Sequence, residues 1–297
     1  MKHLVNPFEI SGKWYKANLH THTTTSDGGV SPAERVGQYR RAGYHVLALT
    51  DHHVTNDVRS LDDKRMLVIS GMEFHPPRSG RKTDPYYHLI GLNIPHGFHF
   101  GPKEQNHANR CIAKIRRAGG LTFLGHPYWS GQEYADFGTL KGLEAMEVYN
   151  STCDFSGRGS SENEWAYALE NGMFLPAIGV DDTHRVASRD LCKCWTWLRM
   201  PALTTAGVLR AVRTGACYAS LGPKIHAFGV SGGKVRLRCS PAARIVFMNG
   251  KSQGATRQAP DGKTITGFSL DLPPWPYVRA VVVDKTGRKA WANPIAL

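Results

Sequence analysis

Short apolar runs alternate with helix-like segments along the first two thirds of the chain. The segments at residues 45–50 and 66–71 are short, mainly apolar runs, which suit strands that are buried on both faces. The segment Ser31-Pro32-Ala33-Glu34 predicts a helix start, with Ser31 as the cap and Glu34 closing a capping box, and the helix ends near Gly43. Further strands are predicted at residues 14–19, 87–94, 121–124, 143–149 and 174–178, and further helices at 104–118 and 162–170. Repeated strand-then-helix units predict an α/β fold with a parallel sheet or barrel.

The pattern changes near residue 220. Short strands are predicted at residues 225–230, 234–239, 244–249, 264–270, 277–283 and 289–292, separated by Gly-Gly, Asn-Gly, Asp-Gly and Thr-Gly turns. A helix at residues 204–214 connects the two regions. We therefore expect two domains, an α/β unit at residues 1–200 and a small antiparallel β module at residues 201–297.

Charge is distributed unevenly between these regions. Residues 1–200 carry 23 Lys and Arg against 21 Asp and Glu, whereas residues 201–297 carry 14 against three, which places +11 of the net charge of +13 in the last third. Histidine is skewed the other way, because 13 of the 14 lie at or before His184. A basic tail with one histidine follows a charge-balanced, histidine-rich front, which supports the expected domain division.

Composition excludes several classes of protein. At 41% hydrophobic residues the chain of 297 residues can bury a sizeable core. It has no apolar stretch of the roughly 20 residues that a membrane helix needs, and no apolar segment near the N-terminus resembles a secretory signal. We expect a cytoplasmic protein without a membrane partner. The six cysteines, including the pair Cys192 and Cys194, are interpreted as reduced thiols and not as a disulfide scaffold.

Histidines and carboxylates gather where the predicted strands end. The segments are Leu19-His20-Thr21-His22 with Ser26-Asp27-Gly28, Thr50-Asp51-His52-His53, Gly71-Met72-Glu73, Gly125-His126-Pro127 and Gly179-Val180-Asp181-Asp182-Thr183-His184. The carboxyl ends of parallel strands meet at one rim, where active sites form. Residues i and i+2 of a strand share a face, so an HxH pair can aim both rings at one ion. Imidazole and carboxylate are ligands of Zn, Mn and Fe, so the sequence predicts a metal cluster.

Other residues near this rim are candidates for substrate contact. Arg158, Arg185 and Arg189 could hold a substrate anion, and Tyr149 and Asn150 end a predicted strand and could line the pocket. An ordinary surface role is the alternative for each arginine. The chain contains no GxSxG elbow, Walker loop or dinucleotide fingerprint that would indicate a different chemistry.

The sequence resembles the PHP family, named for polymerase and histidinol phosphatase. The resemblance rests on NLHTHTTTSDG, LALTDHH, GMEFH, FLGHP and GVDDTH, which occur in the family's order. NPFEISGKWYKANLHTHT, LRAVRTGACYASLGPKI and the terminal WANPI are similar to the branch that contains carbamate-ester (carbaryl) hydrolases. The resemblance implies a distorted seven-stranded β/α (TIM-like) barrel and two or three divalent ions, usually Zn, Mn or Fe.

The same resemblance implies a ligand set for these ions. His20, His22 and Asp182 would hold the first ion together with a bridging Glu73, and Asp27, His52 and His184 would hold the third. Glu73, His88 and His126 would hold the second, with His75 as the rival of His88. Asp51 would orient a ligand histidine or relay a proton, and Asp181 would support the site from behind. The residues expected to act in catalysis are Asp51, Glu73, Asp182 and His184.

Three functions are compatible with this reading. The first is a metal-dependent phosphoesterase in which a metal-bridging hydroxide attacks a phosphomonoester, a nucleotide or the end phosphate of an oligonucleotide. The second is hydrolysis of a carbamate or carboxylic ester by the same cluster, and the third is a binding module with a vestigial site. Every ligand position of the family pattern is filled, which argues against the third.

The basic tail is interpreted either as a structural module or as a weak nucleic-acid-binding face, formed by Lys234, Arg236, Arg238, Arg244 and Lys251.

Overall fold

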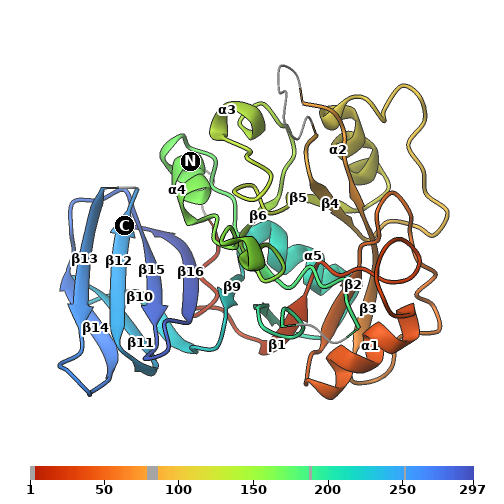
Figure 1. The fold of residues 1–297 in the computed structure, drawn as a ribbon. Helices are drawn as coiled ribbons and strands as arrows, with labels where there is room; N and C mark the ends of the chain where they lie inside the picture. Colours follow the sequence, from red (N-terminus) through yellow and green to blue (C-terminus); the bar gives the residue numbers. More distant parts are fainter. Residues whose placement is uncertain (1–3, 79–85, 187–188, 251) are drawn as a thin grey trace.

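A helix-containing α/β unit and a unit built mainly of strands form the two parts of the molecule, as the computed structural model shows (Figure 1). The structure describes residues 4–78, 86–186, 189–250 and 252–297. Seven strands of the α/β unit lie side by side in chain order. They are β1 (Lys13–Asn18), β2 (Val46–Leu49), β3 (Leu67–Phe74), β4 (Leu89–Leu92), β5 (Leu121–Leu124), β6 (Ala145–Asn150) and β7 (Ala177–Val180).

The prediction of an all-parallel sheet is wrong at one strand. β1, β2 and β3 pair in parallel, and so do β5, β6 and β7, but β4 is antiparallel to both β3 and β5. No helix is seen between β3 and β4 among the residues that the structure describes there, so the chain returns directly beside the strand it has left. The reversal places the amino end of β4, and with it His88, at the rim where the neighbouring strands have their carboxyl ends.

The helices begin and end largely where local chemistry predicts. The bounds are α1 (Pro32–Arg41), α2 (Ala108–Arg117), α3 (Tyr134–Phe137), α4 (Glu162–Glu170) and α5 (Thr205–Thr214), with a 3₁₀ turn at Cys153–Ser156. Ser31 Oγ accepts a hydrogen bond of 3.2 Å from the Glu34 backbone N–H, as expected of the cap. Gly43, just beyond α1, has φ +74°, a conformation that glycine adopts without strain. α2 is shorter than predicted because residues 102–106 form turns before it begins.

The carboxyl ends of β1 and β7 meet at one edge of this unit. Thr21 and Thr183 form a parallel bridge, Asp182 N–H donates to the His20 carbonyl at 2.9 Å, and His22 N–H donates to the Thr183 carbonyl at 3.1 Å. β8 (Trp195–Met200) pairs antiparallel with β1, on the side of β1 that faces away from β2. The backbone thus joins the first and last of the seven strands at the rim where the histidines lie.

The last third of the chain is antiparallel throughout. β10 (Ile225–Ser231), β11 (Lys234–Ala242) and β14 (Ile265–Asp271) form a three-stranded sheet. The other strands extend the large sheet through β9 (Cys217–Ser220), and they are β12 (Arg244–Asn249), β13 (Gln253–Gln258), β15 (Tyr277–Val283) and β16 (Lys289–Ala296). Sequence analysis missed β13, whose residues are almost all exposed and therefore carry no apolar alternation. The division at residue 200 stays a prediction, since β8 and β9 lie in one continuous sheet.

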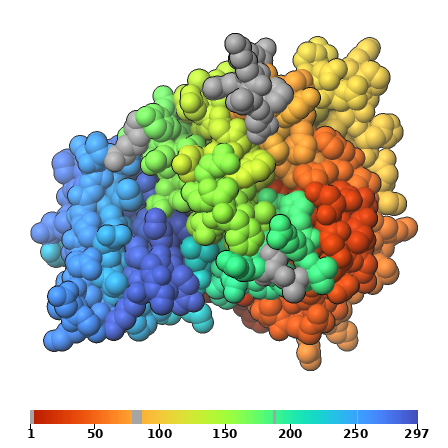
Figure 2. Space-filling model, in the orientation of Figure 1, coloured from red at the N-terminus to blue at the C-terminus, as the bar shows by residue number. Residues whose placement is uncertain are grey.

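Buried side chains connect the two regions. The C-terminal strands lie against the segment that contains α4 (Figure 2), and one apolar cluster includes Trp165 of α4 together with Trp291 of β16. Asn293, 3% exposed, adds polar contacts: its Oδ1 accepts from the Ala177 N–H at 2.7 Å, and its Nδ2 donates to the Cys217 carbonyl at 3.0 Å. β16 is thereby attached to β7 and β9 by hydrogen bonds that are shielded from water.

In the part of the chain that the structure describes, no helix combines the length and the apolar character needed to cross a membrane.

Asn293→Ala should lower the free energy of unfolding by about 3 kcal/mol, because it leaves the buried Ala177 N–H and two carbonyls without a partner. Chemical denaturation of the variant measures the effect. Gln258→Ala on the exposed strand β13 is the control and should change stability little. Equal midpoints for the two variants would contradict the structural role of Asn293.

Candidate metal centre

One carboxylate, that of Glu73, lies at the middle of the histidine cluster. Its side chain is 2% exposed, and both of its oxygens face imidazole nitrogens. Oε2 lies 3.1 to 3.3 Å from nitrogens of His20, His22 and His52. Oε1 lies 3.0 to 3.4 Å from nitrogens of His75, His88 and His126. Six rings from five segments of the chain therefore converge on one residue near the end of β3.

The first group of potential ligand atoms has the dimensions of a small cation site. It comprises His20 Nε2, His22 Nε2, Glu73 Oε2 and Asp182 Oδ1. The two nitrogens are 3.1 Å apart, and Asp182 Oδ1 lies 3.2 Å from His20 and 3.0 Å from His22. A tetrahedral ion with ligand bonds of about 2.0–2.1 Å separates its ligand atoms by about 3.3 Å. These four atoms can therefore surround one divalent ion.

A second group shares Glu73. It consists of Glu73, His88 and His126, and the reversed direction of β4 is what brings His88 to the rim. His75 lies close to the same carboxylate and forms a further group with Glu73 and His52. The geometry therefore brings together both His88 and its rival His75, and the choice between them stays open.

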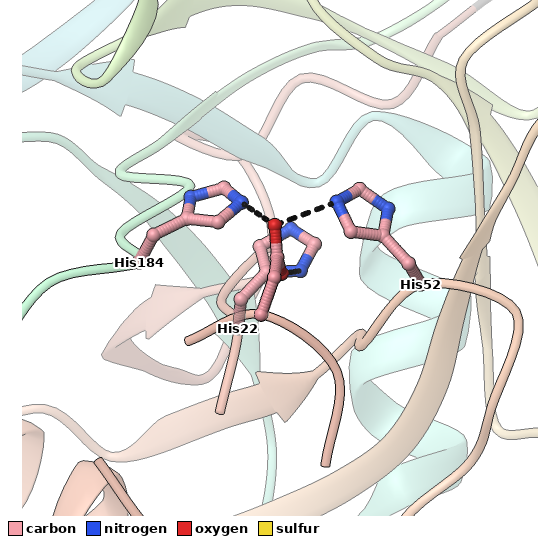
Figure 3. A group of neighbouring side chains, drawn as sticks. His22, His52 and His184 are labelled. Carbon is pink, nitrogen blue, oxygen red and sulfur yellow. Dashed lines mark ion pairs between the residues drawn. The ribbon is translucent and has the colours of Figure 1, made fainter. Parts of the chain in front are cut away.

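The third group is the most exposed. His22, His52 and His184 surround a carboxylate, with ion pairs drawn between them (Figure 3). Asp27 lies 3.5 Å from His52, 3.4 Å from His184 and 3.6 Å from His22. The Asp27 side chain is 53% exposed and those of His52 and His184 are about a quarter exposed, so this side of the cluster faces solvent.

Carboxylates set the protonation of the buried rings. Burial opposes a charge on His22, but hydrogen bonds with Asp182 and Glu73 outweigh it and raise the pKa of His22 to about 9. The pKa of His20 is also raised, since Asp182, Glu147 and Glu73 overcome its burial. For His52 burial dominates and lowers the pKa to about 4. In the absence of a metal, protons supply the positive charge that balances the carboxylates at the first group.

Several buried atoms of the cluster fit a bound cation. Asp182 Oδ1, His22 Nδ1 and His52 Nδ1 are buried and make no contact with full hydrogen-bond geometry within the described residues, although Asp182 Oδ1 lies within ion-pair distance of His20 and His22. Buried polar atoms are normally well paired, so a buried carboxylate oxygen crowded by imidazole nitrogens fits a site where one cation would be shared by all of them. The donor set of imidazole and carboxylate is the one that Zn, Mn and Fe accept.

A buried acid that sequence analysis missed holds two of the rings. Glu147 of β6 accepts from His20 Nδ1 at 2.8 Å, from the His126 N–H at 2.8 Å and from Asn150 Nδ2 at 3.0 Å. The pairing of β6 with β7 is irregular between Glu147 and Tyr149, and such a bulge re-aims the next side chains. Asn150 can therefore also donate to Asp182 Oδ2, at 3.0 Å. The only sequence signal was an acid inside an apolar strand, AMEVYN.

Asp51 has its partners in a loop. Its carboxylate accepts hydrogen bonds from the backbone and hydroxyl of both Thr23 and Ser26 and from Asn56. This loop connects His22 to Asp27, and no hydrogen bond from a histidine to Asp51 is seen among the described residues. A Cβ at Gly28 would come within 2.6 Å of the His22 carbonyl carbon, so the loop also needs a glycine.

A buried arginine joins two sides of the cluster. Arg35 of α1 is fully buried and donates from Nε to the His22 carbonyl at 3.0 Å and from Nη2 to the His184 carbonyl at 3.0 Å.

Asp181, also fully buried, accepts from the Tyr39 hydroxyl and from the backbone N–H groups of residues 192–194. Burial raises the pKa of Asp181 to about 7, against the effect of these donors. Asp181 thus holds the segment that leads into β8.

Two cluster residues have unusual backbones. Asp182 has φ +57° and His126 has φ +21°, both in the left-handed region that L-residues rarely occupy. Strain of this kind persists where surrounding contacts over-determine the position, and it gathers at functional sites. The hydrogen bonds of Asn150 to Asp182 and of Ser130 Oγ to His126 Nδ1, at 2.9 Å, are such contacts.

The remaining substrate candidates are spread more widely. Tyr149 stacks on Trp291 at 5.7 Å and so lies where β6 meets β16. Arg158 is exposed and lies against Trp129, which contacts the cluster. The side chains of Arg185 and Arg189 are exposed. Among the residues that the structure describes, neither side chain forms a hydrogen bond or an ion pair. Of these side chains, that of Arg158 has a recorded contact with an aromatic ring that packs on His126.

Comparison with known sequences gives one partial match. No family model matches the chain. A 5'-3' exoribonuclease of Haemophilus influenzae is 34% identical over 86 residues, a match that covers 27% of this chain and 29% of that protein. The chain therefore matches less than a third of the length of this curated relative.

Solved structures extend the likeness to nearly the whole chain. A two-domain protein from Bacteroides vulgatus, described as containing a predicted PHP-like metal-dependent phosphoesterase, superposes with a TM-score of 0.57. The match has 17% identity and covers 95% of this chain and 94% of that one. An Endonuclease Q complex with a 27-mer duplex has 12% identity and a TM-score of 0.47, over 68% of this chain and 57% of that one. The chain thus shares its fold with the Bacteroides protein.

Glu147→Gln should weaken metal binding by about 10- to 100-fold, because one of its oxygens becomes an amide that cannot accept from its present partners. Metal titration of the variant measures the change. Glu144→Gln is the matched control, since Glu144 precedes the same strand but pairs with Arg213. Equal affinities in the two variants would contradict the orienting role of Glu147.

Metal uptake should release protons, and affinity should rise with pH up to about 9. The reason is that His22, with a pKa of about 9, is protonated at neutral pH and must lose that proton to become a ligand. Adding Zn²⁺ to the metal-free protein in weakly buffered solution at pH 7 should therefore acidify it. Metal uptake without acidification would show that His22 does not lose a proton when the ion binds.

Proposed function

We propose that this protein is a metal-dependent phosphoesterase of the PHP type. The observation that carries the proposal is the buried carboxylate of Glu73 between two groups of imidazoles, an arrangement suited to bridging two cations. The fold shared with the Bacteroides protein supports it. In this proposal β1 to β7 form the distorted seven-stranded barrel of residues 1–200, and residues 201–297 form the second domain.

The proposed ions are two or three of Zn, Mn or Fe. His20, His22, Glu73 and Asp182 would hold the first, Glu73, His88 and His126 the second, and Asp27, His52 and His184 the third. When bound, divalent ions lower the pKa of a water molecule to near neutrality and neutralise phosphate oxygens. Asp182 and His184 would act in this proposal as metal ligands, Asp182 of the first ion and His184 of the third.

The chain's own groups keep the ligands in place. Glu147 accepts the Nδ1 proton of His20, which leaves Nε2 as the free ligand atom. Asn150 orients Asp182 and Ser130 orients His126. Asp51 acts through the loop of residues 23–26, so we assign it a positioning role in place of proton relay.

An anionic phosphomonoester or nucleotide is the proposed substrate class. The exoribonuclease match supports a nucleotide-like substrate, although it covers a limited segment. A carbamate or carboxylic ester is the alternative substrate, and the fold shared with the Bacteroides protein favours the phosphate ester over it. Parallel assays on a phosphomonoester, a phosphodiester and a carbamate ester separate these substrates.

Glu73→Gln should lower metal content and turnover together, since it removes the charge that two groups share. Metal analysis of the purified variant and an assay of phosphate release are the measurements. Chelation of the wild type should abolish turnover, and added Mn²⁺ or Zn²⁺ should restore it. A variant that keeps full metal stoichiometry would remove Glu73 from the bridging role.

The basic tail offers a second surface for an anionic substrate. Arg236 and Arg238 lie on β11, flanked across the sheet by Gly229 and Ser269 and by Ala227 and Gly267, all small residues. They line a hollow of about 500 Å³ together with Phe8, Phe268 and Arg257. Lys234, expected in the same face, is paired with Asp271. Arg244 is exposed on β12 of the other sheet, and Lys251 lies outside the described residues.

We propose that Arg236 and Arg238 attract the phosphates of a single-stranded nucleic acid. Replacing both by Gln should weaken binding of a short oligonucleotide at low salt and reduce the slope of log affinity against log salt by about two. Arg116/Arg117→Gln on the exposed side of α2 removes the same charge elsewhere and should have little effect. Identical binding by both double variants would leave only a structural role for this face.

A further inference from the structure

An exposed tryptophan stands directly beside the proposed metal ligands. Trp129 lies in the loop after β5, and its ring centroid is 5.2 Å from that of His126 and 5.8 Å from that of His88. The side chain is 37% exposed, although burying an indole is favourable and most large apolar groups of this chain are buried. A large aromatic surface thus remains open next to the cluster.

The loop that carries Trp129 is held firmly. Ser130 N–H donates to the His126 carbonyl at 3.1 Å, and the Ser130 hydroxyl contacts His126 Nδ1. Arg78, 4% exposed, donates to the carbonyls of Ser130 at 3.2 Å and Gly131 at 3.1 Å. The backbone that carries the indole is therefore fixed relative to the ligand His126, as a substrate platform requires.

A cation accompanies the indole. The guanidinium carbon of Arg158 lies 6.0 Å from the Trp129 ring centroid, and Nη1 donates to the Trp129 carbonyl at 3.3 Å. Arg158 is exposed, so its remaining donors face solvent. An aromatic surface with a neighbouring guanidinium is suited to a ligand that carries both a flat ring and a negative charge.

We infer that Trp129 and Arg158 form the subsite for the base of a nucleoside phosphate. The inference rests on the proposed phosphoesterase function and adds the residues that would bind the base of a nucleotide substrate. With the ester phosphate at the cluster, a base attached through ribose stacks on the indole, and Arg158 attracts the phosphate charge. Trp129 is then a specificity residue, while hydrogen bonds with Ser130 and Glu147 hold the ligand His126.

Kinetics with two substrates test this inference. Adenosine 5'-monophosphate and ribose 5-phosphate share the ribose phosphate and differ by the base. Trp129→Ala should raise KM for the adenosine monophosphate by about 10-fold or more and leave ribose 5-phosphate hydrolysis and metal content unchanged. Trp129→Phe keeps a ring and should restore most of the affinity. Tyr167→Ala, which removes an exposed aromatic side chain from α4, is the matched control.

A measurement on the unmodified protein covers the case in which a variant fails to fold. Adenosine should inhibit ribose 5-phosphate hydrolysis by the wild type competitively, whereas ribose should not. Equal KM changes for both substrates in Trp129→Ala, or no inhibition by adenosine, would overturn the base subsite while phosphoesterase activity stands. Failure of the metal-replete wild type to hydrolyse either phosphate would overturn the proposed function for these monoesters.

Discussion

The carboxylate of Glu73, buried among six imidazoles, is the constraint on which the rest of the α/β unit depends. A buried carboxylate is costly unless positive charge surrounds it. Here protonated histidines supply that charge in the metal-free protein, and divalent ions can replace those protons. Folding must therefore bring five distant segments to one point, and the stability of the rim is coupled to cation binding.

The surrounding architecture meets this demand with buried polar residues. Arg35 ties the carbonyls of His22 and His184, Asp51 holds the loop between His22 and Asp27, and Glu147 orients His20. Each of these side chains is fully buried and lies behind a candidate ligand. Their shared effect is to remove rotational freedom from the ligand atoms before an ion arrives, which favours binding by reducing the entropy lost.

The two parts of the chain carry different kinds of charge. The cluster concentrates carboxylates that require cations, whereas the three-stranded sheet presents Arg236 and Arg238 beside small residues. Trp129 and Arg158 lie at the edge of the cluster itself. Cation sites, an aromatic platform and a basic face are together suited to substrates that combine phosphate with a flat base.

Local signals in the sequence determined much of this protein. Apolar runs located all seven strands to within three residues at each end, Ser31 marked the start of α1, and histidines at the strand ends identified the cluster. Strand direction was not readable, because a short apolar run such as β4 looks the same in parallel and antiparallel pairing. The positions of Glu147, Arg35 and Trp129 beside the cluster were decided by a bulge, by a helix face and by a loop. Contacts of that kind join residues far apart in the chain, so only the tertiary structure assigns their partners.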